Sequence, residues 1–218
     1  MSRTNTNFVT RKEKLIQQAL EVFIEKGYEN TTIVDLQHRF GLTKGGMYHY
    51  FHSKEDILDA VIAYGLTQSV LELETELEKV PLEEKLVRFF FSSTTNDFTN
   101  KLFKYCKNSH TSIVPYRLRE KTVELTAPIL KSIMRLYVEA GLYHTAFPDE
   151  MAEFSVILAK AIAEDWILPK TDYVHRKRRA DALIDLWSKC TQAPAAHIHE
   201  LRFHLHILVD SKETEQVP

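Results

Sequence analysis

The chain has 218 residues, of which 44% are hydrophobic and 27% charged, the composition of an ordinary soluble globular protein. No apolar run approaches the roughly 18 residues that a membrane-spanning helix needs, and the polar N-terminus lacks the apolar core of a secretory signal, so we expect a cytoplasmic protein with no membrane partner. Its two cysteines, Cys106 and Cys190, lack metal-type spacing; this favours a reducing compartment over a disulfide framework, and we expect both thiols to be buried.

Charge is distributed unevenly along the chain. The formal net charge is −2. The segment up to Lys54 holds eight basic and five acidic residues, a net charge of +3, so the remainder carries −5. A basic first segment joined to an acidic body fits a domain that meets phosphate attached to one that does not.

The apolar pattern predicts an all-α fold. Most apolar residues recur at helical spacing, and no alternating β-branched run is flanked by Asn-Gly or Asp-Gly. A capping box at Thr10–Glu13 predicts the start of a first helix, and Gly27 predicts its end. A second capping box at Thr32–Asp35 opens a short helix that Gly41 stops.

The rest of the chain continues the helical pattern. A third helix is predicted from the cap Thr43 to Phe51, and Ser53 caps a long fourth helix. Pro128 is expected to kink or restart one of the later helices. Proline-separated helices are predicted near 83–107, 118–140, 149–168 and 173–190, another from Ala193 to Val209, and a disordered tail over 210–218.

The second and third predicted helices form a helix-turn-helix. They are joined by the turn Gly41–Thr43, and this arrangement lays its second helix in the DNA major groove. That helix opens with Gly45 and Gly46, each costing about 1 kcal/mol relative to alanine, and then presents Tyr48-His49-Tyr50. Glycines at this place let the backbone approach another surface, and the exposed N–H groups suit phosphate and base acceptors. The pattern therefore predicts DNA binding.

The segment Leu15–Ile62 resembles the DNA-binding domain of the tetracycline-repressor (TetR) family of regulators. The matching pieces are Lys26-Gly27-Tyr28, Thr31-Thr32, the turn Gly41–Gly45, Tyr48–Phe51 and Ser53-Lys54-Glu55. The remainder matches only in helical character and approximate length. The resemblance implies a DNA-binding domain over 1–54, with the fourth helix from about residue 53 as a connector, and a helical regulatory and dimerisation domain over 55–209.

The resemblance also implies a set of DNA-contacting residues. They are Thr32, Thr43, Lys44, Gly45, Gly46, Tyr48, His49, Tyr50 and Lys54. Phosphate-positioning roles fall to Thr32, Lys44, Tyr48, Tyr50 and Lys54, and the face expected to meet bases holds Lys44, Gly45, Gly46 and His49. Gly46 stands where the family often has Thr or Ser, so one side-chain contact is missing. Arg3, Arg11, Lys12 and Lys14 supply either flanking phosphate contacts or solvated charge near the helix start.

For the second part of the chain, the resemblance implies a ligand-responsive repressor that binds a palindromic operator as a homodimer. Most aromatic residues there are core, but some are expected to line a cavity for a small apolar or aromatic effector. The candidates are Phe90, Phe98, Phe103, Tyr105, Tyr137 and Trp166. The family pairs its last two long helices, so the predicted dimer interface includes Phe154, Ile157, Leu158, Ala161, Leu183 and Trp187. No cofactor is implied.

Other classes of function find less support. Four histidines, His197, His199, His204 and His206, invite a metal hypothesis, but no cysteine or clear i,i+4 pair accompanies them, so an amphipathic helix is preferred and no metal is expected. The run His175–Arg179 is interpreted as a solvated helix start rather than a second DNA site. No GxSxG, GxxxxGK, HExxH or CxxC motif favours an enzyme. A helical adaptor that has lost DNA binding is the remaining alternative, and only Gly46 favours it.

Overall fold

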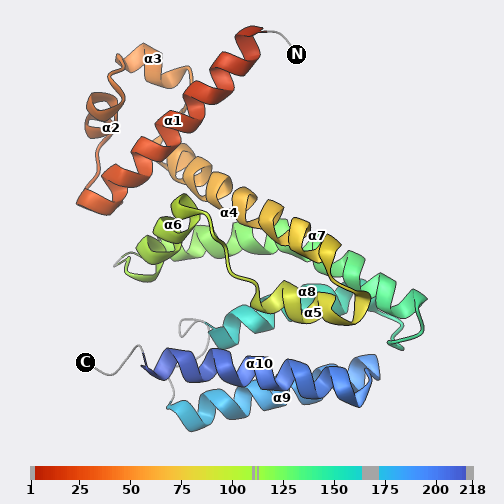
Figure 1. Ribbon diagram of the computed structural model, residues 1–218. Helices are drawn as coiled ribbons and strands as arrows, with labels where there is room; N and C mark the ends of the chain where they lie inside the picture. Colours follow the sequence, from red (N-terminus) through yellow and green to blue (C-terminus); the bar gives the residue numbers. More distant parts are fainter. Residues whose placement is uncertain (1–2, 110, 112, 164–171, 215–218) are drawn as a thin grey trace. The chain divides into compact units, whose positions relative to one another are not determined.

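The structure is a computed structural model that describes residues 3–109, 111, 113–163 and 172–214. These residues form ten α-helices and contain no β-strand, which confirms the all-α prediction (Figure 1). The helices are α1 (Arg3–Lys26), α2 (Ile33–Phe40), α3 (Lys44–Tyr48), α4 (Lys54–Lys79), α5 (Leu82–Phe91), α6 (Asp97–Lys107), α7 (Ile113–Glu139), α8 (Pro148–Ala163), α9 (Tyr173–Thr191) and α10 (Ala195–Thr214). Among the described helices, none is both long and apolar enough to cross a membrane.

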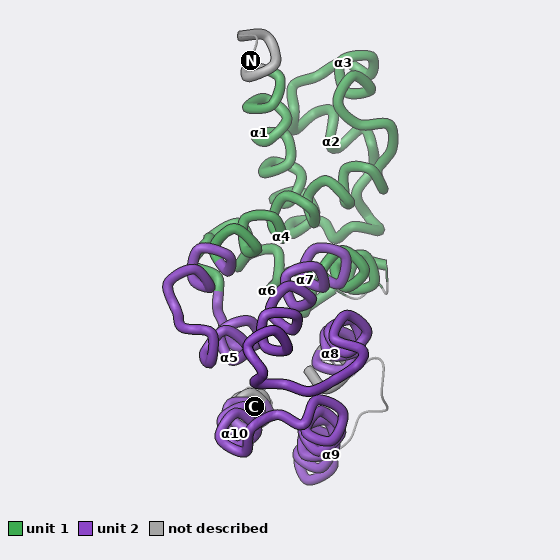
Figure 2. The backbone as a smooth tube through the Cα atoms, turned by 90° about the vertical axis from the view of Figure 1, so that its right-hand side faces the viewer, with its two compact units in different colours: residues 1–72, 94–122 green, residues 73–93, 123–218 purple. Residues whose placement is uncertain are grey.

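The chain divides into two compact units (Figure 2). Unit 1 comprises residues 1–72 and 94–122, and unit 2 comprises residues 73–93 and 123–218. Helices α4 and α7 each pass from one unit into the other. The boundaries of the compact units therefore differ from the predicted domain boundary after residue 54. That boundary separates two predicted functions, and it stays a prediction.

Helix α1 begins at Arg3, ahead of the predicted capping box at Thr10. The residues between contain no glycine or proline, so nothing in the backbone stops the helix from extending. The ring of Phe8 stacks on Tyr50 with centroids 4.9 Å apart, which stabilises the added turns against the helix-turn-helix. At the other end Gly27 adopts φ 79°, the left-handed conformation that glycine favours, and ends α1 as predicted.

The predicted capping box of α2 is confirmed. The backbone N–H of Asp35 donates to Thr32 Oγ1 at 3.1 Å, and the backbone N–H of Thr32 donates to Asp35 Oδ2 at 2.9 Å. Gly41 closes α2 in the left-handed region with φ 62°. Helix α3 ends at Tyr48 instead of the predicted Phe51, because Phe51 is fully buried and the chain must leave the helix to place it.

The predicted helix over 83–107 is two helices, α5 and α6, separated by Ser92–Asn96. Hydrogen-bonding side chains stabilise this break. The Asn96 side chain accepts from the N–H of Thr99 at 3.0 Å and caps α6. The carboxylate of Glu72 accepts from the backbone N–H and the hydroxyl of Thr95, at 3.1 Å and 2.7 Å. Short polar side chains compete with helical backbone hydrogen bonds, which explains the interruption.

Two later helices are longer than predicted. Helix α7 begins at Ile113, ahead of the predicted start at 118, and continues through Pro128 without restarting. Helix α8 is described as far as Ala163, and 164–168 of the predicted 149–168 helix lie outside the described residues. Helix α10 runs on to Thr214 through part of the predicted tail, since Asp210–Thr214 contains no helix breaker; residues 215–218 lie outside the described part.

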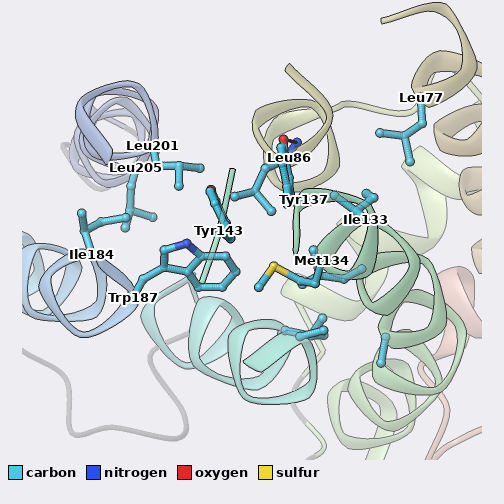
Figure 3. Close-up of a cluster of buried hydrophobic side chains, with 14 of the residues drawn as sticks. Leu77, Leu86, Ile133, Met134, Tyr137, Tyr143, Ile184, Trp187, Leu201 and Leu205 are labelled. Carbon is cyan, nitrogen blue, oxygen red and sulfur yellow. Dashed lines mark hydrogen bonds between the residues drawn. The ribbon is translucent and has the colours of Figure 1, made fainter. Parts of the chain in front are cut away.

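Unit 2 contains an aromatic core, to which α4, α5, α7, α8, α9 and α10 all contribute buried side chains (Figure 3). Tyr137 and Tyr143 are fully buried and stack with centroids 4.6 Å apart. The Tyr137 hydroxyl donates to the carbonyl of Leu82 at 2.6 Å and accepts from the N–H of Leu86 at 3.2 Å, so it joins α7 to α5. Within this unit α9 packs against both α8 and α10.

Candidate nucleic-acid interface

Helix α3 buries Met47 and exposes most of its other positions. Met47 is fully buried, whereas Tyr48 is 42% exposed. The N-cap Thr43 accepts from the N–H of Gly46 at 3.2 Å, which orders the first turn. Five predicted DNA-contacting residues are exposed together here, and we call them the α3 surface: Thr43, Lys44, Gly45, Tyr48 and His49.

Gly46 and Tyr50 are only partly exposed. A β-carbon at Gly46 would meet Thr43 Oγ1 at 3.4 Å, an ordinary contact, so a β-carbon fits there without displacing a neighbour. Tyr50 lies under Phe8, and His49 meets the Phe8 ring edge-on at 5.3 Å. The sequence reasoning missed Phe8. Its only sequence signal is an aromatic side chain in an otherwise polar stretch.

Lys54 and Thr32, both predicted to position phosphates, are bonded within the fold. The Lys54 ammonium donates to the carbonyls of Tyr28 and Thr31, both at 3.0 Å, and lies 4.4 Å from the centroid of the Tyr28 ring. The Thr32 hydroxyl accepts from the N–H of Asp35 and donates to its carboxylate at 2.7 Å. Lys54 therefore holds the α1–α2 turn, and Thr32 holds the start of α2.

Other basic side chains near the helix-turn-helix are also paired. Lys26 contacts Asp35 at 2.5 Å, and this ammonium, together with hydrogen bonds from Thr32, holds the pKa of Asp35 well below its usual range. Arg39 contacts two carboxylates of α1, Glu21 at 3.2 Å and Glu25 at 2.5 Å. Lys44 has no ion pair among the described residues, so its charge on the α3 surface is available to an anionic partner.

The predicted effector residues lie in both units. Phe90 borders a cavity of about 50 Å³ in unit 2, and Tyr137 is a core residue whose hydroxyl is used by backbone groups. In unit 1, the hydroxyl of Tyr105 accepts from the N–H of Tyr28 at 2.9 Å, and Phe98 packs against Tyr64. Phe103 is half-buried on α6, and Trp166 lies outside the described residues. Tyr137 is not among the residues that border this cavity, and its contact with an effector stays a prediction.

The predicted dimer residues divide into an exposed set and a buried one. Phe154, Ile157 and Leu158 on α8 are 56%, 46% and 37% exposed and recur at helical spacing on one face. Trp187 is 4% exposed and belongs to the aromatic core, so it is not available to a partner, and Leu183 borders the unit 2 cavity. The side chain of Ala161 lies outside the described residues.

Two of the four histidines of α10 lie within hydrogen-bonding distance of an acceptor. His204 Nδ1 lies 3.0 Å from the carbonyl of Glu200, and His206 Nε2 lies 3.1 Å from Asp181. Within the described part of the chain, no group of three or more histidine, cysteine or carboxylate side chains is placed to hold a metal ion. Cys106 is buried, but Cys190 is exposed, contrary to expectation, because it lies on the outer face of α9.

Comparisons with known proteins agree with this geometry. Residues 15–61 match the family described as bacterial regulatory proteins, tetR family. The HTH-type transcriptional repressor KstR2 of Mycolicibacterium smegmatis is 29% identical over 114 residues, which span 50% of this chain and 49% of that protein. IcaR, the negative transcriptional regulator of the biofilm operon icaADBC in Staphylococcus aureus, is 21% identical over 62% of this chain and 84% of that protein. The match thus covers about half the length of the first relative.

A solved structure shows the same fold over nearly the whole chain. RolR, in complex with the ligand resorcinol, is 18% identical with a TM-score of 0.58, over 91% of this chain and 95% of that chain. The family match contains the capped α2, the turn at Gly41 and the α3 surface. Residues 15–61, from α1 to the first part of α4, therefore match the tetR family of bacterial regulatory proteins, and this segment contains the helix-turn-helix formed by α2 and α3.

Proposed function

We propose that the protein is a transcriptional repressor that binds a palindromic operator as a homodimer and releases it when a small apolar or aromatic molecule binds. The α3 surface carries this proposal, because it combines an unpaired lysine with exposed backbone and two exposed rings in the second helix of a helix-turn-helix. The names of KstR2 and IcaR, both negative regulators of transcription, support repression. We assign residues 1–54 to DNA binding and 55–209 to regulation and dimerisation.

The proposed division of DNA contacts follows the exposure of the side chains. Lys44 and Tyr48 position phosphates, and His49 with Gly45 meets the bases. Thr43 orders the helix start. Lys54 and Thr32 act through the fold, since their polar groups are bonded to the chain.

The proposed dimer interface is the exposed apolar face of α8. Three apolar side chains are exposed on one continuous face of α8: Phe154, Ile157 and Leu158. Contiguous exposed apolar patches mark interaction sites, whereas single exposed apolar side chains need no such explanation. A second copy of the chain would cover this face in a two-fold arrangement, as closed symmetric dimers do. The resorcinol bound by RolR supports a small aromatic molecule as one class of effector for the regulatory domain.

Selection from random DNA duplexes tests the proposal without knowledge of the operator. We expect an enriched two-fold symmetric site whose half-sites lie about 34–36 Å apart. The double variant Lys44→Ala/His49→Ala should lose the enrichment, and Lys79→Ala, an exposed lysine at the end of α4, should keep it. A protein that enriches no duplex and keeps its fold would favour the adaptor alternative.

A further inference from the structure

Three aromatic rings meet where α3 ends, and we call them the Phe8 cluster: Phe8 of α1, His49 and Tyr50. The Phe8 ring stacks on Tyr50 at an interplanar angle of 13°, with centroids 4.9 Å apart. The His49 ring stands nearly perpendicular to both, with its centroid 5.3 Å from that of Phe8 and 5.3 Å from that of Tyr50. Aromatic pairs favour these stacked and edge-to-face arrangements, so each ring contacts the other two.

Helix α1 brings Phe8 to this place because it begins ahead of the segment that matches the family. Phe8 precedes residues 15–61, so the family match assigns it no role. One turn further along α1, on the same face as Phe8, the Lys12 ammonium lies 5.3 Å from the centroid of the Phe51 ring. Two successive turns of α1 therefore face the segment that follows α3, and both contact rings in it.

His49 depends on the Phe8 cluster for its orientation. Its side chain is exposed, and among the described residues it takes part in no side-chain hydrogen bond or ion pair. An exposed side chain without such contacts occupies several rotamers. The two neighbouring rings restrict the imidazole, while both of its nitrogens keep their capacity to form hydrogen bonds. The cluster thus presets the direction in which His49 can offer a hydrogen bond.

A purely structural role would need less than the cluster provides. The stack of Phe8 on Tyr50 and the contact of Lys12 with Phe51 already attach α1 to the segment after α3. The contact with His49 adds little apolar burial, because His49 stays exposed. What this contact restricts is a side chain proposed to meet the bases, and a base contact requires one hydrogen-bond geometry.

We propose that Phe8 is a positioning residue for base recognition, which orients the His49 ring before DNA binds. This inference rests on the proposed function, in which His49 meets the bases, and it adds a specificity-determining residue outside the helix-turn-helix. A pre-ordered side chain loses less conformational entropy on binding than a free one. Without Phe8, His49 can reach more than one base edge, so the preference for one base should weaken. Phe8 carries no charge, so its loss should leave the phosphate contacts unchanged.

Nuclear magnetic resonance of the protein without DNA tests the cluster first. The variant Phe8→Leu keeps an apolar side chain but removes the ring current that Phe8 exerts on His49. We expect the His49 ring-proton resonances to move in Phe8→Leu and to stay in place in Val9→Ala, a change at the exposed neighbouring position of α1. His199, exposed on α10, should be unaffected by both changes. His49 resonances that stay in place in Phe8→Leu would contradict the contact and the proposal.

Binding to the selected operator and to its single-base variants then measures specificity. The bases read by His49 are those whose preference is lost in His49→Ala. At these positions Phe8→Leu should lower the preference by about fivefold, the lower end of what a good base contact contributes, and leave the salt slope of binding unchanged. Phe8→Tyr, which keeps the ring, and the control Val9→Ala should retain the full preference.

The double variant Phe8→Leu/His49→Ala distinguishes positioning from an independent effect. If Phe8 acts through His49, the double variant should lose no more base preference than His49→Ala alone. A lower melting temperature of Phe8→Leu with unchanged base preference would make Phe8 structural and overturn the proposal. A smaller salt slope with unchanged base preference would also overturn it, because Phe8 would then serve the phosphate contacts.

The same binding experiments separate failure of this inference from failure of the proposed function. If the unaltered protein enriches no duplex, the proposed function is wrong and the inference falls with it. If the protein enriches an operator and Phe8→Leu retains all of its base preferences, the inference alone is wrong.

Discussion

At the scale of single residues, Lys44 and Lys54 show that burial and hydrogen bonding give two side chains of the same type different roles. Both lie in the segment that matches the tetR family. The Lys54 ammonium is bonded to backbone carbonyls at 3.0 Å, while Lys44 is exposed and unpaired among the described residues. Only Lys44 can exchange a counterion for a phosphate without breaking an internal contact.

We therefore expect substitutions of the two lysines to have different effects on stability and on DNA binding. Lys54→Met should lower the free energy of unfolding by about 1–3 kcal/mol, because charge-assisted hydrogen bonds to two carbonyls are lost. Lys44→Ala should change stability by less than about 0.5 kcal/mol and lower the salt slope of operator binding by about one unit per protomer. Urea titration measures the free energy of unfolding of each variant, and fluorescence anisotropy at several salt concentrations measures the salt slope of operator binding. Equal loss of stability in the two variants would contradict the assignment.

Tyr137 predicts a change in stability at alkaline pH. Burial raises the pKa of Tyr137 to about 12, above the ordinary value of 10.0. A group whose pKa is raised on folding contributes stability that is fully present below pH 10 and is lost as pH rises toward 12. Tyr137→Phe should lower the free energy of unfolding at neutral pH by about 1–3 kcal/mol, since Leu82 and Leu86 lose a buried partner.

Urea titrations at neutral pH and above pH 10 check the Tyr137 prediction. The difference in stability between the protein and Tyr137→Phe should shrink as pH rises, because the ionised tyrosine no longer donates its hydroxyl proton. Tyr116→Phe is the control, since Tyr116 is 51% exposed. A difference that stays constant up to pH 12 would mean that Tyr137 does not titrate as expected.

At the scale of helices, the close approach of α4 and α6 depends on a glycine. A β-carbon at Gly65 would lie 2.6 Å from Leu102 Cδ2 and 3.2 Å from the ring of Phe98. The Thr99 hydroxyl also donates to the carbonyl of Gly65 at 2.9 Å, so the backbone of α4 is joined to α6 at this point. Leu102 is fully buried and has little freedom to move.

Gly65→Ala should accordingly destabilise the protein by about 1–3 kcal/mol, the range seen when a packed core is overfilled. Gly45→Ala, where the added carbon meets nothing within 4 Å, should instead leave stability equal or higher. Thermal unfolding of the two variants makes the comparison. A Gly65→Ala protein as stable as Gly45→Ala would show that α4 and α6 can separate at no cost.

At the scale of the whole molecule, the proposed function requires two copies of the chain. We expect the protein to be a dimer at micromolar concentration and Ile157→Glu, in the middle of the exposed α8 face, to dissociate it, because a charge would be buried at the interface. Leu136→Glu, at an exposed position of α7, is the control. Analytical ultracentrifugation distinguishes the species; an Ile157→Glu protein that stays dimeric would place the interface elsewhere.

Loss of the dimer has a consequence for DNA binding. Two half-sites on one palindrome contribute together only if the recognition helices are joined. The monomeric Ile157→Glu protein should therefore bind an intact operator no better than a single half-site.

Local sequence determined the helix-turn-helix. The capping box Thr32–Asp35 and the left-handed Gly41 operate within a few residues, so they are readable from the chain alone. Helix α3 buries Met47, and this burial, unlike the caps, depends on packing against other helices. The break between α5 and α6 was missed because weak polar signals compete there with helical spacing.

Tertiary structure alone decided which polar and aromatic side chains act in the fold. Lys54 bonds to carbonyls of residues 28 and 31, Phe8 stacks on Tyr50, and Trp187 joins an aromatic core drawn from several helices. Arg176 looks in sequence like its exposed neighbour Arg178, yet Arg176 is buried. Burial depends on which distant segments pack against a position, and periodicity along one helix cannot supply that information.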